Sequence, residues 1–574
     1  MKKVIGIIIA TMFISGCGST LKPKVDHLEL VRDGNYNHAE QIIVESVAAE
    51  GSNKLLHYLE MGMLAHLQGN YQKSNQLFDQ AERISEELYT TSISDIGLES
   101  ITGASFSSYK GLNFEQTFVG YYKALNYLKL AETQDKFSES DLDRALVEVR
   151  RLGNRLTELT TKTGGYQEKT DEDESPIEMM LGFLKEALGA SINSDELAYK
   201  DDAFAHYLSG MLFEISGDLD AARVEYEKSA HAYENGFAEN YKLGKKGAAQ
   251  VWYDTARVMK IAGGYDEKLR KISKKHLTSK QRKLLKSVNA KSSELVVIQH
   301  LGFAPQKKQL NMTLTAEAHS KSLVLTPVPM GTEKEKQDQL HWFKMLYADN
   351  DLFTVMKNYA SGDLHAVATA NVTKRISLGP LWGRAEELGL ISALSIPSRV
   401  AVSYYPSMEK TFIKSELFIN GKLASELYQG NNIARIALQE QLNVANTQIQ
   451  LALAREITKA ILAEKTAAAA GQWGAIAGIG LKALNAATAS ADTRNWTTLP
   501  GAIKFARVTL PPGEHKLVLK TQLSSGRILE QSQVVKTTKH RPKMWHTRTL
   551  SRLPKPELTT NTAIAETSKQ TSTE

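Results

Sequence analysis

The spacing of the apolar residues changes near residue 290, and this change restricts the fold more than any other feature of the chain. Residues 30–285 place apolar side chains at helical spacing, whereas residues 293–550 hold short β-branched runs between turn signals. Helices followed by strands are typical of α+β proteins. We therefore expect an N-terminal helical domain at 30–285 and a β-rich domain at 293–550.

Two stretches of the helical segment fit the frame of a tetratricopeptide repeat, in which pairs of helices stack on one another. The first contains Gly62, Gly69, Tyr71 and Phe78, and the second contains Gly210, Gly217, Ala222 and Tyr226. The small residues let paired helices approach closely, and the large ones fill the groove between them. The pattern predicts a tetratricopeptide-like array. Tyr121, Tyr122 and Tyr127 then belong either to its core or to a concave peptide-binding face.

The β-rich segment is expected to form a sandwich-like domain that also contains one long helix. Its pattern predicts a charged connection at 329–338, a strand at 391–396 and a hairpin turn at 420–421. The long helix is predicted at 433–470, and a proline-rich turn at 511–515 is expected to join two strands.

A glycine- and alanine-rich segment follows the long helix at 468–490. Gly474 and Gly478 form a GxxxG pair, which favours close packing of helices. Polar residues interrupt the segment, so a buried or self-associating helix is expected rather than a membrane span, with interfacial membrane contact as the alternative. Residues 554–574 lack core residues and are expected to be disordered.

The start of the chain has the layout of a bacterial lipoprotein leader. Two lysines precede an apolar stretch at 4–14, and the motif that follows is Ile14, Ser15, Gly16 and Cys17. This motif resembles a lipobox, in which the cysteine is acylated and becomes the first residue of the mature chain. The pattern predicts a signal peptide at 1–16 and a lipidated tether at 17–29. The alternative is an ordinary signal peptide with a chance cysteine.

Cys17 is the only cysteine in the chain. Disulfides, thiolate zinc sites and CxxC redox centres are therefore excluded. An aspartate after the cysteine marks retention in the inner membrane in familiar bacterial lipoproteins, and Gly18 stands at that position here. We therefore expect a protein anchored in the outer membrane.

The net charge of +6 is too small to indicate a nucleic-acid-binding protein, and an exported chain is not expected to meet nucleic acid. The charge is nevertheless concentrated. The segment from Lys268 to Lys291 holds ten lysines and arginines and no acidic residue. It predicts contact with anionic lipid, lipopolysaccharide or an acidic partner, or else a solvated basic helix that joins the two domains.

Motifs of catalysis are not recognisable in the chain, because it lacks HExxH, GxSxG, P-loop and GxGxxG patterns. The fourteen histidines show no close pair with a carboxylate at metal spacing, so neither metal nor cofactor is expected. Asp492, Arg494 and Trp496 are expected to lock the long helix to the strand that follows it, with a functional site as the alternative. Two carboxylates from distant positions can still form a glycosidase site, so this class stays open.

Four stretches resemble a family of bacterial outer-membrane lipoproteins that has no established activity. They are YYKALNYL at 121–128, ALVEVRR at 145–151, LVVIQHLGFAP at 295–305 and DTRNWTTLP at 492–500. The family combines a tetratricopeptide-like first half with a C-terminal β domain, so the resemblance implies this location and architecture. The chain departs from the family pattern at His300 and Leu301, where an acidic residue or asparagine usually precedes the glycine, and at Asn495, where serine is common.

Together these features predict a non-enzymatic lipoprotein on the periplasmic face of the outer membrane. We expect it to act as a protein-interaction scaffold or assembly factor for an envelope complex, in secretion, a surface appendage or peptidoglycan synthesis. One alternative is a glycan hydrolase or glycan-binding protein of the cell envelope. Another is a subunit of an oligomeric ring that packs through Gly474 and Gly478.

Overall fold

The computed structural model describes residues 26–91, 107–133, 136–161, 180, 183–184, 199–288, 293–347, 373–395, 397–408, 410–469, 490–539 and 541–551. The lipobox Ile14, Ser15, Gly16 and Cys17, the pair Gly474 and Gly478, and the predicted tail at 554–574 lie outside these residues. Within the described part, helices precede sheets along the chain, so this order of a mixed α and β fold is confirmed.

The first half of the described chain is helical. Its main helices are α2 (His27–Arg32), α3 (Tyr36–Ser46), α4 (Lys54–Leu67), α5 (Tyr71–Thr91), α7 (Asn113–Thr133), α8 (Glu139–Thr161), α10 (Ala203–Ser216), α11 (Leu219–Ala232), α13 (Lys245–Ala262), α14 (Asp266–His276) and α15 (Ser279–Ser287). Local signals set their ends. The Asp202 side chain accepts hydrogen bonds from two backbone N–H groups at the start of α10, and Gly217 ends this helix with a left-handed φ of 89°.

Two helix pairs pack through a glycine against an aromatic ring. A Cβ atom on Gly62 of α4 would lie 2.6 Å from Cε1 of Phe78 on α5, and one on Gly210 of α10 would lie 2.7 Å from Cδ1 of Tyr226 on α11. The small and large positions of the two predicted repeats therefore face each other at the same sequence spacing. The other predicted positions are Gly69 and Gly217 in the turns, Ala222 in the core, and Tyr71, half-buried against the ring of His66.

Twelve strands form three sheets in the described second half of the chain. The strands are β1 (Ser293–Leu301), β2 (Lys308–Glu317), β3 (Ser322–Pro327), β4 (Lys374–Ser377), β5 (Ser398–Tyr404), β6 (Phe412–Ile419), β7 (Lys422–Glu426), β8 (Tyr428–Asn431), β9 (Ala502–Leu510), β10 (Gly513–Leu523), β11 (Ile528–Thr537) and β12 (Lys543–Thr549). The first sheet has the order β12-β1-β9-β8, the second β11-β10-β6-β7 and the third β4-β3-β2-β5. In the first sheet β1 and β12 are parallel.

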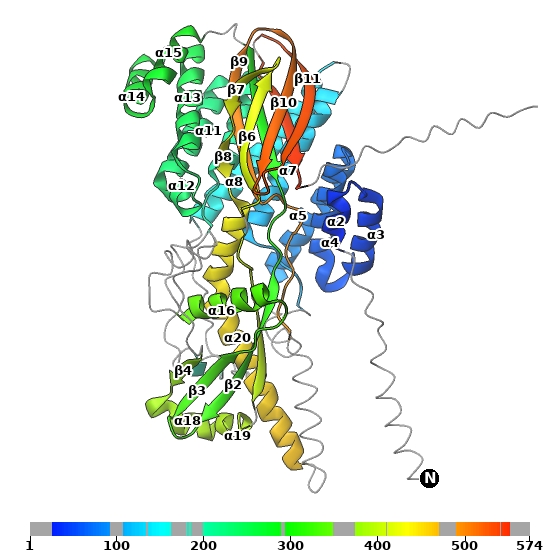
Figure 1. Cartoon of the computed structure of the whole chain (residues 1–574), viewed down its shortest axis with the longest axis vertical. Coiled ribbons are helices and arrows are strands. Elements are labelled where there is room, and N and C mark those ends of the chain that lie inside the picture. Colours follow the sequence, from blue (N-terminus) through cyan, green and yellow to red (C-terminus); the bar gives the residue numbers. More distant parts are fainter. Residues whose placement is uncertain are drawn as a thin grey trace, which may run out of the picture.

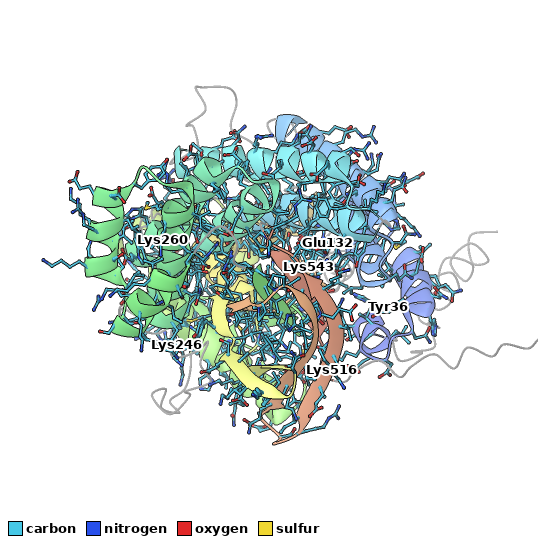
Figure 2. The ribbon with its side chains drawn as sticks, turned by 90° about the horizontal axis from the view of Figure 1, so that it is seen from above. Tyr36, Glu132, Lys246, Lys260, Lys516 and Lys543 are labelled. Atoms are coloured by element: carbon cyan, nitrogen blue, oxygen red, sulfur yellow. The ribbon has the colours of Figure 1, made fainter. Side chains whose placement is uncertain are left out.

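The first sheet lies between the helices and the second sheet. Leu295 and Val297 on one face of β1 share an apolar cluster with Leu417 of β6 and Leu517 of β10, which belong to the second sheet. Residues on the other face of β1, such as Ile298, belong to the main core with the helices. All nine residues of β1 are buried, as expected for a strand covered on both faces. Seen from above, the helices form an arc around the sheets (Figure 2).

The third sheet lies at the opposite end of the molecule, with α16 (Glu333–Tyr347), α18 (Trp382–Glu387) and α19 (Leu390–Ala393) (Figure 1). The long helix α20 (Ile433–Ala469) connects this end with the other sheets, and it confirms the helix predicted at 433–470. The hairpin turn at 420–421 is also confirmed, since both residues have positive φ angles and join β6 to β7.

Two local predictions in this half are wrong. Residues 391–396, predicted as a strand, begin within helix α19. The charged connection at 329–338 contains the start of α16, because Thr332 and Glu335 cap that helix through reciprocal hydrogen bonds. The turn at 511–515 joins two strands as predicted, and it carries the chain from β9 in the first sheet to β10 in the second. Short apolar runs do not distinguish a strand from a buried helix by spacing alone.

Candidate functional sites

A carboxylate of the helical segment holds the loop that precedes β9. Glu60 on α4 is buried and accepts hydrogen bonds from the backbone N–H of Thr497 at 2.7 Å, from the Thr497 hydroxyl at 2.8 Å and from the Thr498 hydroxyl at 2.5 Å. Glu115 on α7 accepts the backbone N–H of Trp496 at 2.9 Å. These helices therefore fix a loop that lies 381 residues after Glu115 and 437 residues after Glu60 in the chain.

The expectation for Asp492, Arg494 and Trp496 needs correction. Arg494 pairs with Asp492 at 2.8 Å, but its guanidinium also donates to the backbone carbonyl of Ser52 at 3.1 Å. Trp496 is fully buried, with its ring 5.6 Å from that of Phe78. The segment is locked to the N-terminal helices rather than only to the neighbouring strand, because its polar groups find their partners there.

A buried charge network forms a second connection between the helices and the first sheet. Glu214 of α10 pairs with Arg257 of α13, and with Arg507 of β9 at 2.9 Å. Arg507 also reaches Asp254 at 3.2 Å. Burial alone would raise the pKa of Glu214, but the two guanidinium groups outweigh burial and lower the pKa to about 2. All four side chains are almost fully enclosed, so each charge depends on its partners.

Two buried histidines, His66 and His300, and the half-buried His546 meet at a third connection. Tyr121 and Tyr122 of α7 bond the two ring nitrogens of His300 on β1, both at 2.9 Å, and His546 of β12 lies 3.0 Å from His300. Burial lowers the pKa of His300 and of His546 well below 6.5, and burial lowers the pKa of His66 to about 4. These rings are therefore neutral hydrogen-bonding groups near pH 7.

The burial of Tyr121 and Tyr122 decides whether these two residues belong to the core or to an open peptide-binding face. Tyr121 and Tyr122 are core residues, with 1% and 0% exposure. The concave side of the helical arc at this point is occupied by the chain's own first sheet, so these tyrosines do not line an open peptide-binding face. The helical and β-rich segments share one continuous core.

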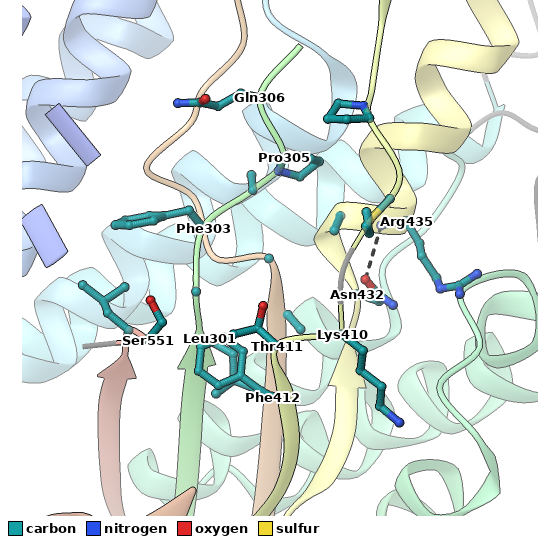
Figure 3. A pocket seen from close by; sticks show the side chains of 18 of the residues that line it. Leu301, Phe303, Pro305, Gln306, Lys410, Thr411, Phe412, Asn432, Arg435 and Ser551 are labelled. Atoms are coloured by element: carbon teal, nitrogen blue, oxygen red, sulfur yellow. Dashed lines mark hydrogen bonds between the residues drawn. The ribbon is translucent and has the colours of Figure 1, made fainter. Parts of the chain in front are cut away.

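A cavity of about 770 Å³ opens at one edge of the sheets. Because β1 and β12 are parallel, both end at this edge, whereas β6 and β9 begin there. The last residue of β1, Leu301, and the residues that follow it as far as Gln306 line the cavity, together with Phe412, Ile413 and Met408. In Figure 3, Phe303 and Phe412 lie on one side, and Lys410 and Arg435 lie on the other. The side of Phe303 and Phe412 is therefore mainly aromatic, with the Arg32 guanidinium 5.3 Å from the Phe303 ring, and the other side is cationic.

Six cationic side chains and one carboxylate line this cavity. The cations are Arg32, Lys242, Lys308, Lys410, Arg435 and Lys504, and the carboxylate is Asp26. Arg32 pairs with Glu29, and Lys308 pairs with Glu335 at 2.7 Å. Among the described residues, no carboxylate forms an ion pair with Lys410, Arg435 or Lys504.

Lys504 is the most unusual of these cations. It is only 8% exposed, and its ammonium group donates one long hydrogen bond, 3.4 Å, to the carbonyl of Ile413. Burial lowers the pKa of Lys504 to about 8, against the weaker attraction of Glu426. Burial likewise lowers the pKa of Arg435. With a pKa of about 8, Lys504 remains mainly protonated at pH 7 in a poorly solvated position.

The basic segment forms a helical hairpin, α14–α15, which we call the basic hairpin. It lies at the outer end of the helices (Figure 1). Ile272 and Leu285 are buried, and Lys260 of α13 donates to the carbonyls of Leu285 and Lys286, both at 2.7 Å. The exposed cations that form no ion pair within the described residues are Arg270, Lys274, Lys275, Lys280, Arg282, Lys283 and Lys286. The segment is thus a packed hairpin with a charged outer face, not one connecting helix.

A second cavity, of about 660 Å³, has carboxylates in its lining, but they already have cationic partners. His206 contacts Asp201 at 3.0 Å and Glu225 at 2.7 Å. Burial opposes the charged form of His206, but the two carboxylates hold its pKa at about 9. Glu227 pairs with Arg223 and Lys268. The cationic cavity has one carboxylate in its lining, so it does not offer the two carboxylates of a glycosidase.

The described part of the chain contains neither a cluster of metal-binding side chains nor a membrane-spanning helix. Its histidines, aspartates and glutamates nowhere form a group of three or more that could hold a metal ion. None of its helices combines the length and apolar character needed to cross a bilayer. Comparisons with protein-family models, curated proteins and solved structures gave no match.

The cavity was not predicted from the sequence, because its lining comes from widely separated segments. The one signal lies in the stretch LVVIQHLGFAP, whose last residues, from Leu301 to Pro305, form part of the lining. The basic hairpin, in contrast, was visible as a run of charge.

Proposed function

We propose that the protein is an outer-membrane lipoprotein of the periplasmic face that acts as a non-enzymatic scaffold or assembly factor. The leader with Cys17 and the four stretches that resemble a lipoprotein family support this proposal. The glycine–aromatic contacts of α4–α5 and α10–α11 support a tetratricopeptide-like array, and the shared apolar cluster of the first and second sheets supports a sandwich-like arrangement.

The basic hairpin is the observation that carries the interaction proposal. Its seven cations that form no ion pair within the described residues project from a packed hairpin whose second helix, α15, begins with a capping box, so a partner meets a preformed surface. An acidic envelope protein is the partner that this surface fits best. The anionic lipid or polymer contact predicted for the segment from Lys268 to Lys291 would use the same charges. The pathway, whether secretion, appendage assembly or peptidoglycan synthesis, depends on the partner's identity.

The shared core determines how the proposal is tested. Removing residues 293–553 would expose the apolar side of the helical arc and leave Glu214 without Arg507, so loss of capture by such a truncation would reflect misfolding. Surface substitutions avoid this problem. A tag after Pro556 permits crosslinking and purification from native outer membranes.

The test compares two triple charge reversals. The hairpin variant carries Lys274→Glu, Lys275→Glu and Lys283→Glu. The control carries Lys516→Glu, Arg527→Glu and Lys536→Glu, which change the same total charge on exposed positions of β10, of β11 and of the turn between them. We expect one dominant partner that is captured by the wild type and the control but lost from the hairpin variant and in high salt. Equal capture by both variants would refute the role of the hairpin. Co-purifying glycan without protein would favour a glycan-binding function.

A further inference from the structure

The cationic cavity holds an excess of positive charge that the described chain does not neutralise. Lys504 lies on the face of β9 that also carries Ala506, so its side chain enters the end of the space between the first and second sheets. A lysine residue that is 8% exposed and whose ammonium donates one 3.4 Å hydrogen bond to a carbonyl is poorly compensated. Lys410 and Arg435 add two more cations without ion pairs. This arrangement fits an anionic group placed among the three.

The opposite wall of the cavity is mainly apolar, although the Arg32 guanidinium lies over one face of the Phe303 ring. Phe303 and Phe412 lie on that side (Figure 3), with Met408 and Ile413 in the same lining. Gly302 has a φ of 57°, and a Cβ atom there would lie 3.0 Å from the ring of Phe412. The volume of about 770 Å³ falls in the usual range for sites that hold small organic ligands. A purely hydrophilic anion would leave this wall uncovered.

The position of the cavity in the chain limits the source of the ligand. Asp26 lines it, nine residues after Cys17. If Cys17 is acylated as in the proposed function, nine residues of extended chain keep the cavity within about 30 Å of the bilayer surface. Membrane lipids are then the amphiphiles closest to the cavity. The choice of membrane lipid as the ligand rests on the proposed function, whereas the charge and shape of the cavity do not.

We propose that the cavity binds one anionic phospholipid. Its phosphate lies among Lys410, Arg435 and Lys504, and part of an acyl chain lies along Phe303 and Phe412. The phosphate supplies the counter-charge that the three cations lack, and the acyl chain covers apolar surface that otherwise faces water.

The proposal is tested by ligand titration of the full-length lipoprotein, purified in a neutral detergent. The probes are dihexanoyl phosphatidylglycerol, which is anionic, dihexanoyl phosphatidylcholine, which is zwitterionic, and inorganic phosphate. Binding is measured as the concentration-dependent rise in the thermal unfolding temperature. We expect the phosphatidylglycerol to bind at least about tenfold more tightly than either other probe, because only it combines net charge with acyl chains.

Two substitutions and a matched control assign the binding to the cavity. Lys504→Met and Arg435→Gln are each expected to weaken phosphatidylglycerol binding by about tenfold or more. Lys516→Met removes an exposed lysine of β10 and leaves binding unchanged. Without lipid, Lys504→Met is expected to unfold at the wild-type temperature or above it, because the poorly solvated charge is gone. This result separates loss of binding from loss of folding.

Each other outcome overturns the proposal. Equal binding of the two lipids removes the anionic requirement, and phosphate that binds as tightly as phosphatidylglycerol indicates a site for free phosphate. Wild-type lipid binding in both cavity variants places the lipid elsewhere. Since the assay does not use the partner or the basic hairpin, its failure is distinct from a failure of the scaffold proposal.

Discussion

Glu214→Gln tests whether the buried charge network holds the helices to the first sheet. The substitution keeps the size of the side chain but removes the negative charge that faces Arg257 and Arg507. Both guanidinium groups are 1% exposed, so water does not replace the lost partner. Asp254 remains 3.2 Å from Arg507 and retains part of the compensation.

The expected loss of stability follows from the pKa of Glu214. Lowering that pKa from 4.5 to about 2 corresponds to about 3 kcal/mol of stabilisation of the folded state. Removing one member of a buried ion pair in other proteins costs about 3–5 kcal/mol, which agrees with this value. Because the pKa is depressed by folding, the contribution is complete above pH 4.5 and disappears as the pH falls toward 2.

Urea unfolding followed by tryptophan fluorescence measures the difference. The control is Glu530→Gln, which breaks an exposed ion pair with Lys520 and is expected to cost less than about 1 kcal/mol. At neutral pH we expect Glu214→Gln to reduce the free energy of unfolding by about 3 kcal/mol, and the difference from wild type should shrink below pH 4.5. Equal stabilities of the two variants would show that the network does not contribute as argued.

Three further predictions concern other contacts. Gly210→Ala should destabilise the protein by about 1–3 kcal/mol in a thermal melt, because its Cβ overlaps an aromatic ring, whereas Gly153→Ala, with open space around it, should stabilise α8 slightly. His206→Asn should cost about 3 kcal/mol below pH 6.5, and the cost should vanish as the pH rises through about 9, which pH-dependent denaturation can follow. Glu60→Gln should cost about 2 kcal/mol and increase hydrogen exchange in the two threonines that it holds.

Features set by neighbouring residues were predictable from the sequence. The glycine–aromatic spacing of α4–α5 and α10–α11, the long helix α20 and the turn at 420–421 all depend on residues close together in the chain. Strand β12 was missed, because Lys543–Thr549 is short and polar and pairs in parallel with β1, about 250 residues earlier. Local alternation does not show such a pairing.

The two candidate sites differ in the same way: one depends on neighbouring residues and the other on residues far apart in the chain. The basic hairpin is one continuous run of charge and was predicted as a contact surface. The cationic cavity is assembled from the ends of β1 and β12, the starts of β6 and β9, and residues near α2 and α20. Lys504 illustrates the difficulty: in the sequence it is an ordinary lysine in a strand, and only the closure of two sheets around it makes its charge unusual.

The helical segment supports the cavity as well as any partner surface. Three carboxylates on three helices, Glu60, Glu115 and Glu214, hold groups that flank or belong to β9. Thr498 lies three residues before Gly501 in the cavity wall, so the hydrogen bonds to Glu60 help fix that wall. Glu60→Gln should therefore weaken ligand binding through displaced backbone, with a loss of stability, whereas Lys504→Met weakens binding without such a loss. The contrast separates residues that position the site from residues that contact its ligand.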